Sequence, residues 1–234
     1  MIIDRYISDY SCQEYHESRG VLTGIIQAMD SMQTRNFSES VIFAGGRLCL
    51  DFVNTSCMRL GLPLEFIGDT EALNRWLEAA ARIYGVPEHW QAHDAADSLS
   101  HAYELRSALK SLFDGARMGS APSGAAIKVV NATLRAAPAY LQLETVSEGF
   151  GSSLVSKRTD DPWLAEIARD AVDLLCHADI SLLRQCECAT CVRFFYDTTK
   201  NHARRWCIEK CGSRVKAANY YRRKRLAKAA APSA

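Results

Sequence analysis

The sequence predicts an α+β fold, with a predominantly helical body that contains a short strand and a β-hairpin, followed by a small metal-stapled module. Between residues 69 and 180, apolar residues recur at helical spacing in four separate stretches. Two alternating segments flank Gly149, and four cysteines form two close pairs near the C-terminus. The 234 residues are 48% hydrophobic and 24% charged, which is typical of a globular protein with a buried core.

The body is expected to span residues 41–182, beginning close to Phe43. Residues 1–40 are polar and weakly periodic, which predicts a poorly structured N-terminal extension. Residues 47–52 follow a glycine turn and alternate between apolar and polar types. This alternation predicts a short strand with one buried face.

Four helices are predicted to follow, each bounded by residues that commonly cap or interrupt helices. Their expected limits are Asp69 or Thr70 to Gly85, beyond Pro87 through Phe113, after Pro122 and Ser123 through Leu134, and Asp161 through Ala178. Between the third and fourth helices, residues 140–146 alternate and are separated by Gly149 from residues 152–157. This arrangement predicts a β-hairpin.

The two cysteine pairs have the spacing of a tetrahedral four-thiolate zinc site. Cys188 and Cys191 are separated by two residues, and Cys207 and Cys211 by three. One helical turn places Cys207 and Cys211 on the same side, and an aromatic strand over residues 192–197 lies between the pairs. We predict a treble-clef-like zinc finger over residues 183–228, with one structural Zn²⁺ and a disordered tail over residues 229–234.

Cys186 competes with Cys188 for the first ligand position. Cys186 lies four intervening residues from Cys191, a gap that also occurs in zinc sites. The tight two-residue turn favours Cys188.

Positive charge is concentrated in the same part of the chain. Residues 181–234 contain 13 Lys or Arg and 3 Asp or Glu, whereas residues 1–180 contain 15 and 24. The last segment has cations on every side of a predicted helix, which favours contact with a polyanion such as nucleic acid over packing on a core. The candidate nucleic-acid-binding residues are Arg204, Arg205, Arg214, Lys216, Arg222, Arg223, Lys224 and Arg225.

The C-terminal segment resembles the CGNR zinc-finger family. The resemblance rests on the Cys188 and Cys191 pair, the aromatic run 194–197, the Arg-Arg-Trp-Cys run 204–207, and Cys-Gly-Ser-Arg at 211–214. Ser213 stands where the family pattern has Asn. Both residue types are short and polar and cap helices, so we expect the fold to be retained.

The body resembles the ABATE domain that usually precedes this finger. The residues that carry the resemblance are 46–55 and 105–109. Together the two resemblances cover about residues 41–226. They imply a bacterial protein whose finger binds DNA and whose body senses a signal in stress-linked transcription control.

No catalytic set emerges from the sequence, and we expect no enzymatic activity. His89 and His93 lie four residues apart, where a solvated helix face is the favoured interpretation. The chain has no glycine-rich phosphate loop after a strand and no nucleophile elbow. A polar set forms either a buried structural network, which we favour, or the floor of a ligand pocket: Asp51, Asn54, Thr55 and Arg106.

These observations predict a zinc-dependent, DNA-binding transcription regulator whose body senses a small molecule or stress signal. The alternatives are an RNA-binding module, in which Phe194 and Tyr196 stack on bases, a protein-interaction module, and an enzymatic body. The chain opens without a leader-like segment, and residues 21–26 are too short for a membrane span. We therefore expect a cytoplasmic protein with reduced thiols and no membrane partner. A second copy of the chain is a further candidate partner.

Overall fold

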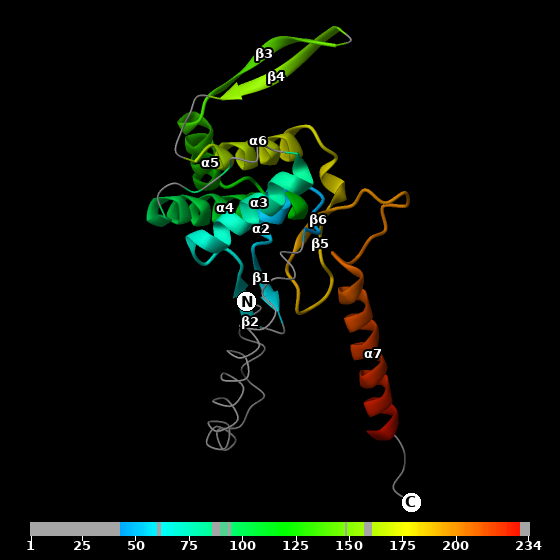
Figure 1. Cartoon of the computed structure of the whole chain (residues 1–234). Coiled ribbons are helices and arrows are strands. Elements are labelled where there is room, and N and C mark those ends of the chain that lie inside the picture. Colours follow the sequence, from blue (N-terminus) through cyan, green and yellow to red (C-terminus); the bar gives the residue numbers. More distant parts are fainter. Residues whose placement is uncertain are drawn as a thin grey trace, which may run out of the picture. The chain divides into compact units, whose positions relative to one another are not determined.

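The computed structural model describes residues 43–59, 62–85, 90, 92, 95–147, 149–156 and 161–229 (Figure 1). The predicted N-terminal extension, residues 230–234 of the predicted tail, and the pair His89 and His93 lie outside these ranges. Among the described helices, none combines the length and apolar character needed to cross a bilayer.

The prediction of a strand over residues 47–52 is wrong, because Leu48–Val53 form helix α2. All six residues of α2 are buried, since the helix packs against α4 (Ala95–Met118) and α6 (Pro162–Cys176). A short helix buried on every side has no polar face to reveal its period. The alternation of its residue types therefore carried no information about which faces are buried.

A small hairpin that the sequence did not suggest follows α2. Strands β1 (Ser56–Arg59) and β2 (Leu62–Glu65) pair antiparallel, with Cys57 opposite Leu64. Pro63 lies inside β2, and proline is uncommon within strands except at edges. That residue weakens the strand signal at this position.

The four predicted helices are confirmed as α3 (Thr70–Tyr84), α4, α5 (Gly124–Ala136) and α6. Asp69 caps α3 by accepting a hydrogen bond from the Ala72 backbone N–H at 2.7 Å, and Gly85 ends the helix in the left-handed conformation. Ser123 caps α5 in the same way through the Ala126 N–H. Local capping chemistry thus predicted these boundaries well.

Asp161 precedes α6 as expected but does not cap it through its side chain. Its carboxylate instead accepts hydrogen bonds from the Ser98 hydroxyl on α4 and from the Trp163 ring N–H. The residue therefore joins α6 to α4. This role depends on a contact between distant parts of the chain and could not be read from the cap position.

The main core lies between α2, α3, α4 and α6, with α5 packed against α4 and α6. Its largest fully buried side chains include Trp76, Trp163, Phe52 and Phe113. Phe194, from the C-terminal part of the chain, belongs to the same core and contacts Phe113 edge to face with ring centroids 6.0 Å apart. The finger strand is therefore built into the core of the body.

The predicted hairpin between the third and fourth helices is also confirmed. Strands β3 (Ala139–Val146) and β4 (Gly149–Ser156) pair antiparallel over their full length, from Ala139 opposite Ser156 to Val146 opposite Gly149 (Figure 1).

The C-terminal part begins with a short 3-10 helix (Ile180–Leu182) and strand β5 (Leu183–Gln185). Strand β6 (Phe194–Tyr196) pairs antiparallel with β5, and helix α7 (Glu209–Ala229) follows. This order matches the predicted finger of a turn, an aromatic strand and a helix. The fold is thus a mainly helical α+β body with short strand pairs and a small cysteine-rich finger.

Candidate metal centre and nucleic-acid interface

Four cysteine sulfurs converge in the C-terminal part of the chain. The Sγ atoms of Cys186, Cys191, Cys207 and Cys211 all lie within 4.8 Å of one another, and all four residues are buried. The Cys191–Cys207 and Cys207–Cys211 sulfurs are 3.6 and 3.8 Å apart. Zn–S bonds of about 2.3 Å in a tetrahedron require sulfurs about 3.8 Å apart, so this set fits zinc.

The structure differs from the predicted ligand set at one position, because Cys186 takes the place of Cys188. The backbone N–H of Cys191 donates to the Cys188 carbonyl at 2.8 Å, which closes a turn between the two ligands. The Cys188 sulfur lies 3.4 Å from the Thr190 hydroxyl. Cys188 therefore lies within the turn, and its sulfur is not one of the four clustered sulfurs. The Cys186 sulfur, four intervening residues before Cys191, completes the cluster instead.

Backbone hydrogen bonds place the ligands at the ends of regular elements. Cys186 follows β5, and its N–H donates to the Arg193 carbonyl at 2.9 Å, which continues the pairing toward β6. Cys211 lies in the first turn of α7. A Cβ atom added to Gly212 would lie 3.0 Å from the Trp206 ring, so this glycine lets α7 begin close against the indole.

The thiols influence one another's ionisation. Hydrogen bonds from Cys191 and Cys207 lower the pKa of Cys186, whereas hydrogen bonding to Cys186 and Cys191 raises the pKa of Cys207. Ionisation of one of the four clustered thiols is therefore favoured, and ionisation of further thiols is opposed. A divalent cation that accepts four thiolates supplies the compensating charge, with release of protons on binding.

Two of the predicted nucleic-acid-binding arginines have structural partners. Arg204 donates to the carbonyls of Trp206 and Cys207 and lies over the Phe195 ring, 4.6 Å from its centroid. Arg205 forms an ion pair with Glu187 and lies over the Trp206 ring. Both side chains therefore stabilise the turn that leads to Cys207.

The remaining predicted cations lie on α7 and are exposed. None of them forms an ion pair with a carboxylate in the described parts of the chain. Although burial opposes it, hydrogen bonds from Thr190 and Arg214 lower the pKa of Cys188, so Arg214 also has a contact within the finger. The cations without a described protein contact are Lys216, Arg222, Arg223, Lys224 and Arg225.

Two residues join the finger to the body in a role that the sequence did not predict. The Asn54 side chain donates to the Phe194 carbonyl and accepts from the Phe194 N–H, both at 2.8 Å. Arg193 is only 8% exposed, and its guanidinium lies 3.5 Å from the Cys57 sulfur on β1. A contact between distant segments leaves no local pattern in the sequence. The one available signal was the position of Arg193, between a zinc-ligand cysteine and an aromatic strand, where a charged residue is unexpected.

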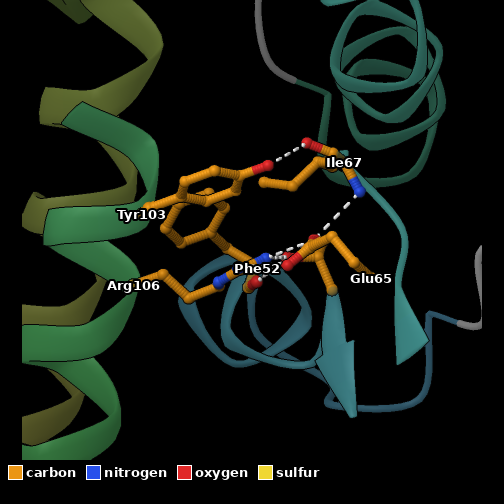
Figure 2. Close-up of polar contacts among 6 residues, drawn as sticks. Phe52, Glu65, Ile67, Tyr103 and Arg106 are labelled. Atoms are coloured by element: carbon orange, nitrogen blue, oxygen red, sulfur yellow. Dashed lines mark hydrogen bonds and ion pairs between the residues drawn. The ribbon is translucent and has the colours of Figure 1, made fainter. Parts of the chain in front are cut away.

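The predicted pocket residues do not converge around a cavity. Arg106 donates to the Thr55 hydroxyl at 2.8 Å. It also forms a paired contact with Glu65, as Figure 2 shows. Asp51 instead accepts from the backbone N–H groups of Ala44 and Gly45 and from the Tyr84 hydroxyl. Burial raises the pKa of Asp51, and these hydrogen bonds oppose the rise. The polar set is a structural network.

Around Arg106 that network holds the β1–β2 hairpin against α4. The Tyr103 hydroxyl donates to the Ile67 carbonyl at 3.0 Å, and Arg106 lies over the Tyr103 ring, 4.9 Å from its centroid (Figure 2). Glu65 also accepts from the Ile67 N–H at 3.1 Å. Every group in this network has a protein partner, which supports a structural role.

A separate open cleft of about 420 Å³ lies beside α2, α3 and α6. Its arginines are paired with carboxylates: Arg47 contacts Asp170 and Asp173, and Arg169 contacts Glu166. The lining residues are Gly46, Arg47, Leu48, Tyr84, Glu166, Arg169, Asp170 and Asp173.

Two family models match the chain in succession. Residues 46–178 match the ABATE model, described as "Putative stress-induced transcription regulator", and residues 183–224 match the CGNR zinc finger. No curated protein matches the chain. The match to the finger agrees with the sulfur geometry, and the cysteine cluster is the site of one structural zinc.

Proposed function

The chain belongs to the ABATE family and ends in a CGNR zinc finger, and from this premise we propose that it is a DNA-binding transcription regulator. The observation that carries the proposal is the surface of α7. From Lys216 to Leu226 every residue of this helix is exposed and the segment is strongly basic, while the first turn is attached to the zinc cluster. The metal thus holds one end of a helix whose other end is available to a polyanion.

Phosphate contact is the main source of affinity in this proposal. Each phosphate neutralised by a lysine or arginine releases condensed counterions, so the affinity falls as salt rises. The described residues around Lys216, Asn219, Arg222 and Arg223 form an open hollow on one side of the helix. Arginine and asparagine can pair with guanine and adenine edges in the major groove, which is wide enough to admit an α-helix.

We further propose that the body changes DNA binding in response to a small molecule or stress signal. The supporting observation is a short connection between the open cleft and the finger. Gly46 and Arg47 line the cleft, and the neighbouring Gly45 carbonyl accepts a hydrogen bond from the Tyr196 N–H on β6 at 2.8 Å. Arg204 also donates to the Ala44 carbonyl at 3.3 Å. A ligand that shifts this loop would act directly on the finger strand.

RNA binding is the alternative that a specific observation supports. Phe194 is buried in the core and is not available to stack on a base. Tyr220 and Tyr221, in contrast, are exposed on α7 with ring centroids 5.5 Å apart. Exposed aromatic rings among cations are typical of proteins that bind single strands.

A selection of bound sequences from random duplex DNA tests the proposal. The full chain is used with zinc present, and the enriched duplex then competes against single-stranded RNA of equal length at fixed salt. Enrichment of a defined sequence and preference for the duplex are expected. Binding only to the single strand would replace the DNA proposal with the RNA alternative, and binding to neither would leave the protein-interaction alternative.

A further inference from the structure

Arg193 is buried without a carboxylate partner among the described residues. It is only 8% exposed, and within those same ranges its Nε atom has no hydrogen-bond partner. The guanidinium contacts the Cys57 sulfur at 3.5 Å, and a thiol is a weak acceptor. The other buried charged residues that the structure describes, Asp51 and Asp197, each accept several hydrogen bonds. A buried cation without such partners needs another source of negative charge.

The main chain of Arg193 is attached to two of the four clustered cysteines. Its carbonyl accepts a hydrogen bond from the Cys186 N–H at 2.9 Å, and its own N–H is hydrogen-bonded to the Cys191 sulfur. Arg193 also directly precedes β6, whose first residue, Phe194, belongs to the core of the body. The base of the arginine side chain is therefore fixed between the sulfur cluster and the core.

The negative charge that favours the guanidinium comes from sulfur. Besides its contact with Cys57, the guanidinium lies 5.9 Å from the centroid of the Phe66 ring. Away from solvent, charges are screened weakly and attract each other more strongly than on the surface. Although burial opposes it, the charges of Cys57 and of the clustered sulfurs of Cys191 and Cys207 raise the pKa of Arg193. The arginine is thus electrostatically linked to the cluster as well as to β1.

A zinc-loaded cluster would provide the charge that Arg193 lacks. One Zn²⁺ and four thiolates together carry an excess of negative charge, and an arginine side chain stays protonated beside them. The two other arginines that stabilise this part of the finger already have oxygen partners. Arg204 donates to the Trp206 carbonyl, and Arg205 is paired with Glu187. Arg193 is therefore the arginine whose charge is available to the cluster.

We propose that Arg193 is the counter-ion of the zinc–thiolate centre and sets how tightly the finger binds zinc. Arg193 is not a ligand, and its guanidinium offsets part of the excess negative charge of the four thiolates. A buried charge that opposes folding of the zinc-free chain becomes favourable when the metal is bound. Groups that surround the ligands of a metal site typically change the metal affinity by about 10- to 100-fold, which sets the expected size of the effect.

Zinc affinity of the full chain, measured by competition with a metal indicator, tests this proposal. Arg193→Met removes the charge but keeps a long, flexible side chain, and Arg193→Lys keeps the charge. Arg184→Met is the matched control, because it removes an exposed arginine from β5 of the same finger. The affinity should fall by about 10- to 100-fold for Arg193→Met and by less than about threefold for Arg184→Met. Arg193→Lys should bind zinc at least about threefold more tightly than Arg193→Met.

Four results would overturn the proposal. One is an unchanged affinity of Arg193→Met, and another is an equal loss for Arg184→Met, which would indicate an effect of the net charge of the finger. If Arg193→Lys binds no better than Arg193→Met, the shape of the side chain matters and its charge does not. An equal loss for Cys57→Ala would assign the counter-charge to the Cys57 sulfur.

Folding of each zinc-loaded variant is checked by circular dichroism. If Arg193→Met does not fold, Arg193→Gln repeats the comparison with an uncharged side chain that still forms hydrogen bonds, and the same loss of affinity is expected. None of these measurements uses DNA, so they are independent of the proposed function.

Discussion

The two ends of α7 lie in different environments. At its start, Cys211 and Gly212 are buried beside the sulfur cluster and the Trp206 ring. From Tyr220 to Leu226 every residue is exposed, and four consecutive cations occupy positions 222–225. The position and the charge of the helix are therefore provided separately: the metal and the core orient the helix, and its far end is free to contact a partner. Changes at the start should therefore alter folding, and changes at the end should alter binding.

Removal of zinc should have the largest effect and acts on the start of the helix. Structural zinc contributes an apparent binding free energy of about 10–16 kcal/mol in isolated fingers, which is larger than the stability of most domains. We expect chelation to unfold α7 and the segments that carry the cysteines, while α3–α6 stay folded. Amide hydrogen exchange after chelation measures this directly, with protection lost in α7 and retained in α4 and α6. Equal loss in both regions would contradict a separate finger over residues 183–228.

A pair of serine substitutions sharpens the ligand assignment. Cys186→Ser removes a sulfur from the cluster, and its effect on zinc affinity should exceed the about 10- to 100-fold typical of changes outside the ligand shell. Cys188→Ser changes only the turn and should cost about tenfold or less. Competition with a metal indicator measures both affinities. A larger loss for Cys188→Ser would restore the ligand set that the sequence favoured.

The contact between α2 and β6 should be the next largest contribution to stability. Asn54→Ala leaves the buried N–H and C=O groups of Phe194 without partners, which costs about 1–3 kcal/mol for each group. Asn219→Ala is the matched control, because Asn219 is exposed on α7, and it should change stability by less than about 0.5 kcal/mol. Urea unfolding of the zinc-loaded chain compares the two. A similar, small effect of both substitutions would mean that body and finger are not coupled through Asn54.

Substitutions at the far end of α7 should change stability least and DNA binding most. Arg222→Ala/Arg223→Ala should reduce the slope of log affinity against log salt by up to about 1.8, if both arginines contact phosphates. Stability should stay within about 0.5 kcal/mol, since both side chains are exposed. Arg75→Ala/Arg82→Ala removes two exposed arginines from α3 and should leave the slope unchanged. An unchanged slope in the α7 variant would exclude these two arginines from the interface.

Local signals were sufficient for much of the fold and for part of the site. Asp69, Gly85, Ser123 and Pro162 predicted helix ends because capping and breaking depend on a few neighbouring residues. The β3–β4 hairpin was predicted for a similar reason, since alternation and a glycine lie within one short segment. Cys207 and Cys211 could be predicted to lie together because only three residues separate them, although Cys207 lies before the start of α7.

Other features depended on contacts between distant segments. α2 is a helix because α4 and α6 surround it, and that burial removes the polar face that would reveal its period. The spacing of the cysteines left Cys186 and Cys188 in competition, and the turn between β5 and β6 brought the Cys186 sulfur to the cluster. Arg106 was placed with Asp51 from its sequence context but pairs with Glu65 on a hairpin that Pro63 concealed.

By itself, the sequence determined the four long helices of the body, the long hairpin, the zinc-binding composition of the finger and the basic character of its last helix, because each of these follows from spacing, capping or charge within a short segment. Only the tertiary structure decided which sulfur completes the cluster, how Asn54 and Arg193 join the finger to the body, and which cations keep no protein partner. The contacts of Asn54 and Arg193 join residues more than one hundred positions apart in the chain, where local pattern carries no information.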